Sequence, residues 1–164
     1  MESNGQNFSI EPATAADVPE ILRLIRALAE YEKLSHEVVA TEESIRKSLF
    51  GADPAAEALM ARVDAHAVGF AVVFRNYSTF RGKAGLYLED LFVEPAYRGH
   101  GCGRALLLAV AQLAVRRGCE RLDWSVLDWN APAIGFYKSV GAKAIDDWTI
   151  FRLSGEALRS FAAG

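Results

Sequence analysis

Apolar residues recur along this chain with two different spacings, and the alternation between them predicts strands and helices in turn. Short alternating or continuous apolar runs are typical of strands, whereas apolar residues three and four positions apart are typical of one helix face. The expected strands cover residues 8–11, 59–63, 68–74, 86–93, 122–127 and 148–153. The expected helices begin near Thr14, after Thr41, at Ala105, at Ala131 and after Ser154. Because helices fall between strands throughout, the pattern predicts one α/β domain with a mixed sheet.

Turn-forming and capping residues mark the ends of these elements. Thr14 and Asp17 have the spacing of a capping box, so a helix should start there. Gly118 follows the helix from Ala105 and suits the left-handed position after a helix C-terminus. The strands on either side of Ala65–His66 should form a hairpin closed at that pair, and the polar stretch 76–83 is expected to be a loop.

Length and composition agree with a single globular domain. The chain has 164 residues, of which 51% are hydrophobic and 24% are charged. We expect residues 8–164 to form the domain and the polar residues 1–7 to be a disordered or polar extension. The net charge is −3 and no run of Lys and Arg stands out, which argues against nucleic acid or an anionic membrane surface as the main partner.

The cysteine content indicates a reducing compartment. Cys102 and Cys119 form neither a disulfide framework nor a metal site, and no His/Cys cluster has zinc-ligand spacing, so no metal is expected. The N-terminus lacks an apolar signal core, and no apolar run approaches the roughly 20 residues of a membrane span. These features predict a cytoplasmic protein.

The most informative stretch is Arg98-Gly99-His100-Gly101-Cys102-Gly103, between the strand run 86–93 and the helix run 105–115. Glycines at alternating positions let the backbone turn tightly and approach a ligand closely. Amide N–H groups at the start of a helix favour a phosphate. The stretch therefore resembles a cradle for a diphosphate.

Other interpretations of this loop fit less well. A dinucleotide fingerprint needs G-x-G-x-x-G near the chain start, whereas the spacing here is G-x-G-x-G. A nucleotide P-loop needs Gly-Lys-Ser/Thr, but Gly103 is followed by Arg104 and Ala105. A tight turn with no ligand remains open, although three glycines are more than a turn needs.

The order and spacing of several short motifs resemble the GNAT acetyltransferase superfamily and, within it, the diamine (spermidine/spermine-type and thialysine-type) N-acetyltransferases. The resemblance covers about residues 10–161 and implies a single GNAT-like domain whose central mixed sheet has helices on both faces. It is carried by Pro12 to Asp17, Ile21 to Ile25, Tyr87 to Val93, Tyr97 to Gly99, Arg98-x-x-Gly101-x-Gly103, Trp129-Asn130 and Phe136 to Lys138.

The resemblance implies acetyl-CoA as co-substrate, with its pyrophosphate on the glycine loop. Asn130 would hold the pantetheine end, although capping of the helix that follows is an equally good role for it. The implied cofactor-binding residues are Leu91, Phe92, Val93, Arg98, Gly99, His100, Gly101, Cys102, Gly103, Arg104, Asn130, Tyr137 and Lys138.

Acetyl transfer to an amine requires a base, because a primary amine with a pKa near 10 is about a thousandfold more protonated than free at pH 7. Glu89 lies in the apolar run 86–93, where burial would raise its pKa toward a useful value. The resemblance assigns the amine carboxylate to Glu89, acting directly or through water. It assigns the general acid for the departing thiolate to Tyr137. Without a catalytic role, Glu89 would be a carboxylate on one face of the sheet and Tyr137 a tyrosine of the core.

The acceptor site is expected to contain further acidic and aromatic residues. In a regular strand, Asp90 would point to the face opposite Glu89, although a bulge could bring both acids to one side. The preferred interpretation is that Asp90 is structural or lies near the cationic substrate. The resemblance places the pair Tyr31 and Glu32 at the amine site, and a solvated helix end is an equally good interpretation of this pair. The expected substrate-binding residues are Tyr31, Glu32, Glu89, Asp90, Asp123, Trp124 and Ser125.

These observations predict direct transfer of an acetyl group, in a ternary complex, to a primary amine of a small cationic molecule such as a polyamine or thialysine. A protein or peptide amine is the first alternative acceptor, and a non-catalytic acyl-CoA-binding module is the second. The resemblance also implies a homodimer.

Overall fold

The computed structural model describes residues 7–164, so all but the last residue of the expected N-terminal extension lie outside the described chain. The chain divides into two compact units, Met1–Ser125 and Val126–Gly164.

The first unit is built on a five-stranded sheet with the order β1-β2-β3-β4-β5. The first four strands pair antiparallel with their neighbours, and β5 pairs parallel with β4. The expected mixed sheet is therefore confirmed. The strands are β1 (Phe8–Pro12), β2 (Glu57–Val63), β3 (His66–Ser78), β4 (Lys83–Val93) and β5 (Leu122–Trp124).

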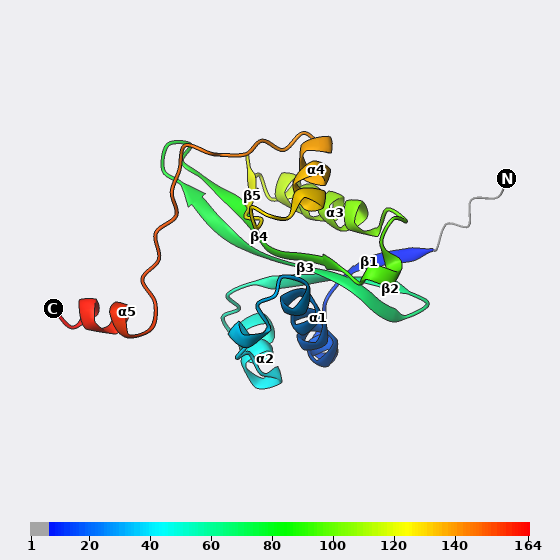
Figure 1. Ribbon diagram of the computed structural model, residues 1–164, viewed down its shortest axis with the longest axis horizontal. Coiled ribbons are helices and arrows are strands. Elements are labelled where there is room, and N and C mark those ends of the chain that lie inside the picture. The colour runs from blue at the N-terminus through cyan, green and yellow to red at the C-terminus, as the bar shows by residue number, and fades with distance from the viewer. Residues whose placement is uncertain (1–6) are drawn as a thin grey trace. The chain divides into compact units, whose positions relative to one another are not determined.

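Helices cover both faces of this sheet, as expected. Figure 1 shows α1 (Val18–Tyr31) and α2 (Glu42–Phe50) on one face and α3 (Cys102–Arg116) on the other. Ile21 and Leu24 of α1 are fully buried in one cluster with Phe70 of β3. Each such side chain contributes about 1.5–3 kcal/mol on burial, so packing rather than helix propensity holds these layers together. Short 3₁₀ turns lie at Ala15–Asp17, Ser35–Glu37 and Pro95–Tyr97.

The predicted capping box at the start of the first helix is present. The backbone N–H of Thr14 donates to a carboxylate oxygen of Asp17 at 2.8 Å. Asp17 is buried, which alone would raise its pKa, but bonds from Thr14 and Arg62 outweigh burial and lower that pKa. The capping pair encloses the 3₁₀ turn Ala15–Asp17, and the α-helix itself follows directly at Val18.

Two expectations around β3 are wrong. The hairpin turns at Asp64 and Ala65, both with positive φ, and His66 pairs with Val63. The segment 76–83 is not a loop, because β3 and β4 stay paired as far as Ser78 and Lys83. Backbone pairing extends both strands through polar residues whose pattern alone does not indicate a sheet.

The second unit contains α4 (Ala131–Ser139) and α5 (Gly155–Ala162), as predicted. The expected strand 148–153 does not form, and the strand expected over 122–127 is reduced to β5. A strand needs a partner for its backbone groups, and 148–153 has none among the described residues. Its large apolar side chains are left exposed, including Trp148 at 77% and Phe151 at 91%. Within residues 7–164, no helix is long and apolar enough to cross a bilayer.

Candidate functional site

The glycine loop joins the end of β4 to the start of α3, as expected. Gly99 and Gly101 have φ angles of 80° and 85°, which L side chains rarely adopt. Gly101 is the N-cap of α3, whose first-turn N–H groups have no partner within the helix. A Cβ placed on either glycine would meet no protein atom within 4 Å, so open space lies beside the loop. The loop fits a phosphate-bearing ligand.

Arg98 holds the loop in place. Its Nε donates to the backbone oxygen of Val93 at 2.8 Å, which ties the loop to the end of β4. The guanidinium also lies over two rings, 4.6 Å from the centroid of Tyr31 and 5.4 Å from that of Phe92. Arg98 therefore links α1, β4 and the loop in one contact network.

Cys102 is the first residue of α3 and its side chain is buried. Burial raises the pKa of its thiol. A thiol kept protonated is a poor nucleophile, so Cys102 serves the packing of the helix start. His100 and Arg104 are exposed beside it on the loop and in the first turn.

A β-bulge in β4 lies at Glu89. Leu88 pairs with Val73, and Asp90 pairs with the adjacent residue Val72, so Glu89 has no cross-strand partner. The Glu89 side chain is exposed, contrary to the expectation that its apolar neighbours would bury it. The bulge reverses the alternation of the strand from this point, and sequence periodicity cannot show that.

The bulge places Asp90 on the face of the sheet that carries α1, which we call the α1 face. Its cross-strand partner Val72 packs in the buried cluster beneath α1 and α2. The Asp90 pKa is raised to about 7, first by burial and then by the charges of Glu89 and Glu32. Burial also raises the pKa of Glu32, at the C-terminus of α1. The fold thus brings together three carboxylates that the sequence places on two separate elements.

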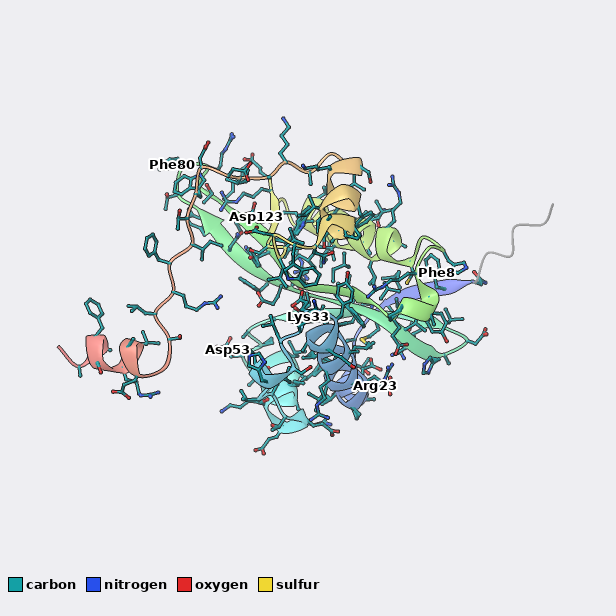
Figure 2. The ribbon with its side chains drawn as sticks, viewed as in Figure 1. Phe8, Arg23, Lys33, Asp53, Phe80 and Asp123 are labelled. Atoms are coloured by element: carbon teal, nitrogen blue, oxygen red, sulfur yellow. The ribbon has the colours of Figure 1, made fainter. Side chains whose placement is uncertain are left out.

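The α1 face continues along β3, β4 and β5 beyond the carboxylates. The rings of Phe74 and Tyr87 stack with centroids 5.0 Å apart. The Tyr87 hydroxyl bonds to the Ser125 hydroxyl at 2.8 Å, and the Asn76 amide donates to Asp123 at 3.2 Å. Figure 2 marks Asp123 on β5.

Trp124 pairs with Leu88, and strand alternation places it on the sheet face opposite Asp123. Of the three expected substrate-binding residues 123–125, Trp124 is therefore on the other face of the sheet from Asp123. Sequence reasoning missed Phe74, Asn76 and Arg121. Arg121 forms an ion pair with Asp123 at 2.9 Å. An Asp two residues from an Arg just before a strand is the only signal for that pair, and it is a weak one.

Leu91 lies in β4 and Gly103 in the first turn of α3. The predicted site residues of the second unit lie at the start and on the body of α4. Asn130 is buried and caps the helix, its side-chain oxygen accepting from the N–H of Ala133 at 3.3 Å. Tyr137 is half-buried and its ring lies 5.4 Å from that of Phe136. Phe136 is also half-buried. Lys138 is exposed on the last turn.

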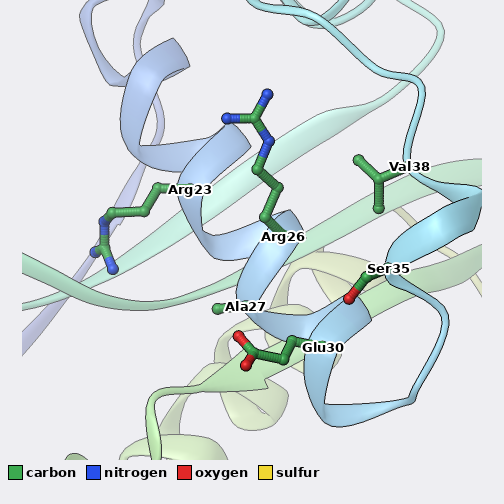
Figure 3. Close-up of a pocket in the computed structure, with 6 residues that line it drawn as sticks. All are labelled: Arg23, Arg26, Ala27, Glu30, Ser35 and Val38. Atoms are coloured by element: carbon green, nitrogen blue, oxygen red, sulfur yellow. The ribbon is translucent and has the colours of Figure 1, made fainter.

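A pocket of about 420 Å³ opens beside α1 and the segment that follows it (Figure 3). Arg23, Arg26, Glu30 and Ser35 supply its polar groups. None of the predicted site residues lines it. In the part of the chain that the structure describes, no group of three metal-ligating side chains could hold an ion.

Known acetyltransferases are similar in sequence to this chain over most of its length. The chain is 41% identical to the thialysine N-epsilon-acetyltransferase of Bos taurus, with 93% of this chain and 96% of that protein covered. It is 33% identical to the L-ornithine N5-acetyltransferase NATA1 of Arabidopsis thaliana, with 92% and 86% covered.

The fold also matches solved structures. An integron cassette protein from the mobile metagenome of V. cholerae superposes with a TM-score of 0.81 at 26% identity, over 98% of this chain and 100% of that chain. The model of the acetyltransferase (GNAT) family matches residues 21–142, which include β2 to β5, the glycine loop and all of α4. The chain therefore belongs to the GNAT family and is an acetyl-CoA-dependent N-acetyltransferase.

Proposed function

We propose that this protein transfers the acetyl group of acetyl-CoA to a primary amine of a small cationic substrate, such as thialysine, a polyamine or a related diamino compound. The observation that carries the proposal is the group of three carboxylates, Glu32, Glu89 and Asp90, at the bulge of β4. Such a group attracts an ammonium ion and can take its proton. Relatives named for thialysine and L-ornithine acetylation support the same acceptor class.

The glycine loop is the proposed pyrophosphate site. Its positive-φ glycines keep side chains out, and the first turn of α3 presents backbone N–H groups. Arg98 keeps the loop in this shape through its bond to Val93. When bound there, acetyl-CoA supplies an acetyl thioester whose carbonyl carbon the free amine attacks, so that a C–N bond forms as the C–S bond breaks.

Removal of the ammonium proton falls to the acids at the bulge. Glu89 is exposed and can contact the incoming amine, in agreement with its proposed role as the base. Asp90 is the second candidate, because a pKa of about 7 balances the two protonation states near neutral pH. On this view Glu32 and the other two acids also hold the cation in place.

Rates measured against pH separate the two bases. If Glu89 takes the proton, Glu89→Gln lowers kcat by about 10²–10⁴-fold, and Asp90→Asn retains most of the activity. If Asp90 takes it, the low-pH limb of kcat/KM near pH 7 disappears in Asp90→Asn. If Glu89→Gln keeps its kcat and Asp90→Asn keeps the low-pH limb, neither carboxylate is the base.

Tyr137 is the proposed general acid, which returns a proton to the departing thiolate. Tyr137→Phe removes only the hydroxyl, so it should lower kcat by about 10²-fold or more while acetyl-CoA affinity measured by calorimetry stays nearly the same. Tyr77→Phe, at an exposed position of β3, is the matched control and should leave both unchanged. Unaltered turnover in Tyr137→Phe would contradict the assignment.

The central test is release of CoA. Purified protein is incubated with acetyl-CoA and with thialysine, ornithine, spermidine or a lysine-containing peptide, and free thiol is measured together with the mass of the products. We expect the small amines to be acetylated in preference to the peptide. Preference for the peptide would favour a macromolecular acceptor, and tight acetyl-CoA binding without turnover of any amine would favour a non-catalytic module.

A homodimer and a cytoplasmic location complete the proposal. The exposed apolar side chains of 148–153 support a second copy as a partner, because a surface rich in large apolar residues favours association. Cys102 and Cys119 are both free thiols, which agrees with a reducing compartment.

A further inference from the structure

The carboxylate of Asp123 is held in one orientation on the α1 face by two neighbours. The Asn76 amide donates to its Oδ2 at 3.2 Å, and the Arg121 Nε lies 2.9 Å from the same oxygen. The side chain of Asp123 is 39% exposed. Both contacts use Oδ2, so Oδ1 can still accept a hydrogen bond from a bound ligand.

Arg121 brings a positive charge to the same place. Its side chain is 46% exposed, and its contact with Asp123 uses one of the five N–H groups of a guanidinium. The terminal nitrogens can therefore bind a carboxylate in the bidentate manner that arginine favours. A carboxylate and a guanidinium therefore lie side by side. Their two charges are opposite to those of the ammonium and the carboxylate of an α-amino acid.

An aromatic surface connects this pair to the acids at the bulge. Tyr87 is the register partner of Asp123, and its ring stacks on Phe74. Phe74 lies two residues from Val72, the partner of Asp90, so all of these side chains share the α1 face. With a rise of about 3.3 Å per residue and a strand spacing of about 4.8 Å, the positions of Asp90 and Asp123 are about 8 Å apart. A short methylene chain spans this distance over the two rings.

The charges at this surface distinguish two classes of acceptor, simple diamines and diamino acids. A simple diamine would bring a second cation next to the guanidinium of Arg121 and gain little. A diamino acid would present its ammonium to Asp123 and its carboxylate to Arg121, so each charge would meet its opposite.

We propose that Arg121 and Asp123 form a specificity subsite for the α-amino-carboxylate end of a diamino acid, whose side-chain amine reaches the acids at the bulge. The subsite rests on the proposed function. It makes Arg121 a determinant of acceptor choice and leaves the transfer step to the acids at the bulge.

The experiment compares ornithine with 1,4-diaminobutane, which has the same amine spacing without the carboxylate. In the wild type, kcat/KM should favour ornithine. Because hydrogen bonds between charged groups are stronger than those between neutral groups, Arg121→Gln should raise the KM for ornithine about tenfold or more with little change in kcat. The KM for 1,4-diaminobutane should stay the same or fall, since the competing cation is gone.

Arg75→Gln is the matched control. Arg75 is an exposed arginine next to Asn76 on β3, but alternation places it on the opposite face of the sheet. The Arg75→Gln substitution removes the same charge as Arg121→Gln and should change the KM of neither acceptor. If both acceptors are acetylated and Arg121→Gln alters them equally, or alters neither, the subsite is wrong while the proposed function stands. If the wild type acetylates no amine, the proposed function fails and the subsite fails with it.

Discussion

At the scale of single residues, Asp90 is the residue whose environment in the structure differs most from what the sequence indicates. The apolar run around Glu89 indicates a buried glutamate, but the bulge exposes Glu89 and gives Asp90 the raised pKa of about 7. The cause is the unpaired position in β4, which places Asp90 on the α1 face near Glu32. Residue types predict the chemistry of this segment, and the strand register decides which acid has the perturbed environment.

The raised pKa of Asp90 has a consequence for stability. A carboxyl that binds its proton more tightly in the folded state favours folding less as the pH rises from about 4, its unfolded value, toward 7. Asn is neutral throughout, so Asp90→Asn should gain in Tm relative to the wild type between pH 5 and pH 8. Thermal unfolding at both pH values measures this difference. Asp53→Asn, at an exposed aspartate, is the control, and an equal gain at both pH values would contradict the assignment.

At the scale of elements, the loop between β4 and α3 is where sequence and structure agree best. Glycine is favoured where φ is positive, and two of the loop glycines have such angles. Gly118, after α3, has φ of 71° and ends the helix as its position predicts. The same backbone requirement therefore occurs at both ends of α3, but only the N-terminal end presents free N–H groups to a ligand.

This symmetry allows a matched pair of variants. Gly101→Ala and Gly118→Ala each force a side chain into the left-handed region at a cost of about 1–2 kcal/mol, with no contact to other atoms at either site. Both should lower the free energy of unfolding by similar amounts. Only Gly101→Ala should also weaken acetyl-CoA binding, measured by calorimetry. Equal affinity in the two variants would argue against the loop as the pyrophosphate site.

At the scale of the whole molecule, the segment 148–153 of the second unit is where the expected strand and the structure disagree. The apolar pattern of 148–153 predicts a strand, but these residues lie exposed without strand pairing. A strand pattern is satisfied only when another strand supplies hydrogen-bonding groups and an apolar surface. We expect this segment to be covered in the assembled protein.

Light scattering in solution should accordingly give twice the mass of one chain. Ile150→Lys places a charge within the exposed segment and should shift the protein toward the monomer at micromolar concentration. Val39→Lys, at an equally apolar and exposed site of the first unit, should leave the mass unchanged. A wild-type monomer would overturn the dimer.

Local patterns determined most of the element types, the mixed α/β class, the glycine loop and the family, because periodicity, capping residues and positive-φ glycines act over a few residues of chain. Only the tertiary structure decided the bulge at Glu89, the extension of the β3–β4 hairpin through 76–83, and the meeting of Glu32 with Asp90. It also decided the pairing of Arg121 with Asp123. These features depend on strand register and on contacts between distant segments, and neither is written in the spacing of residues along one strand or helix.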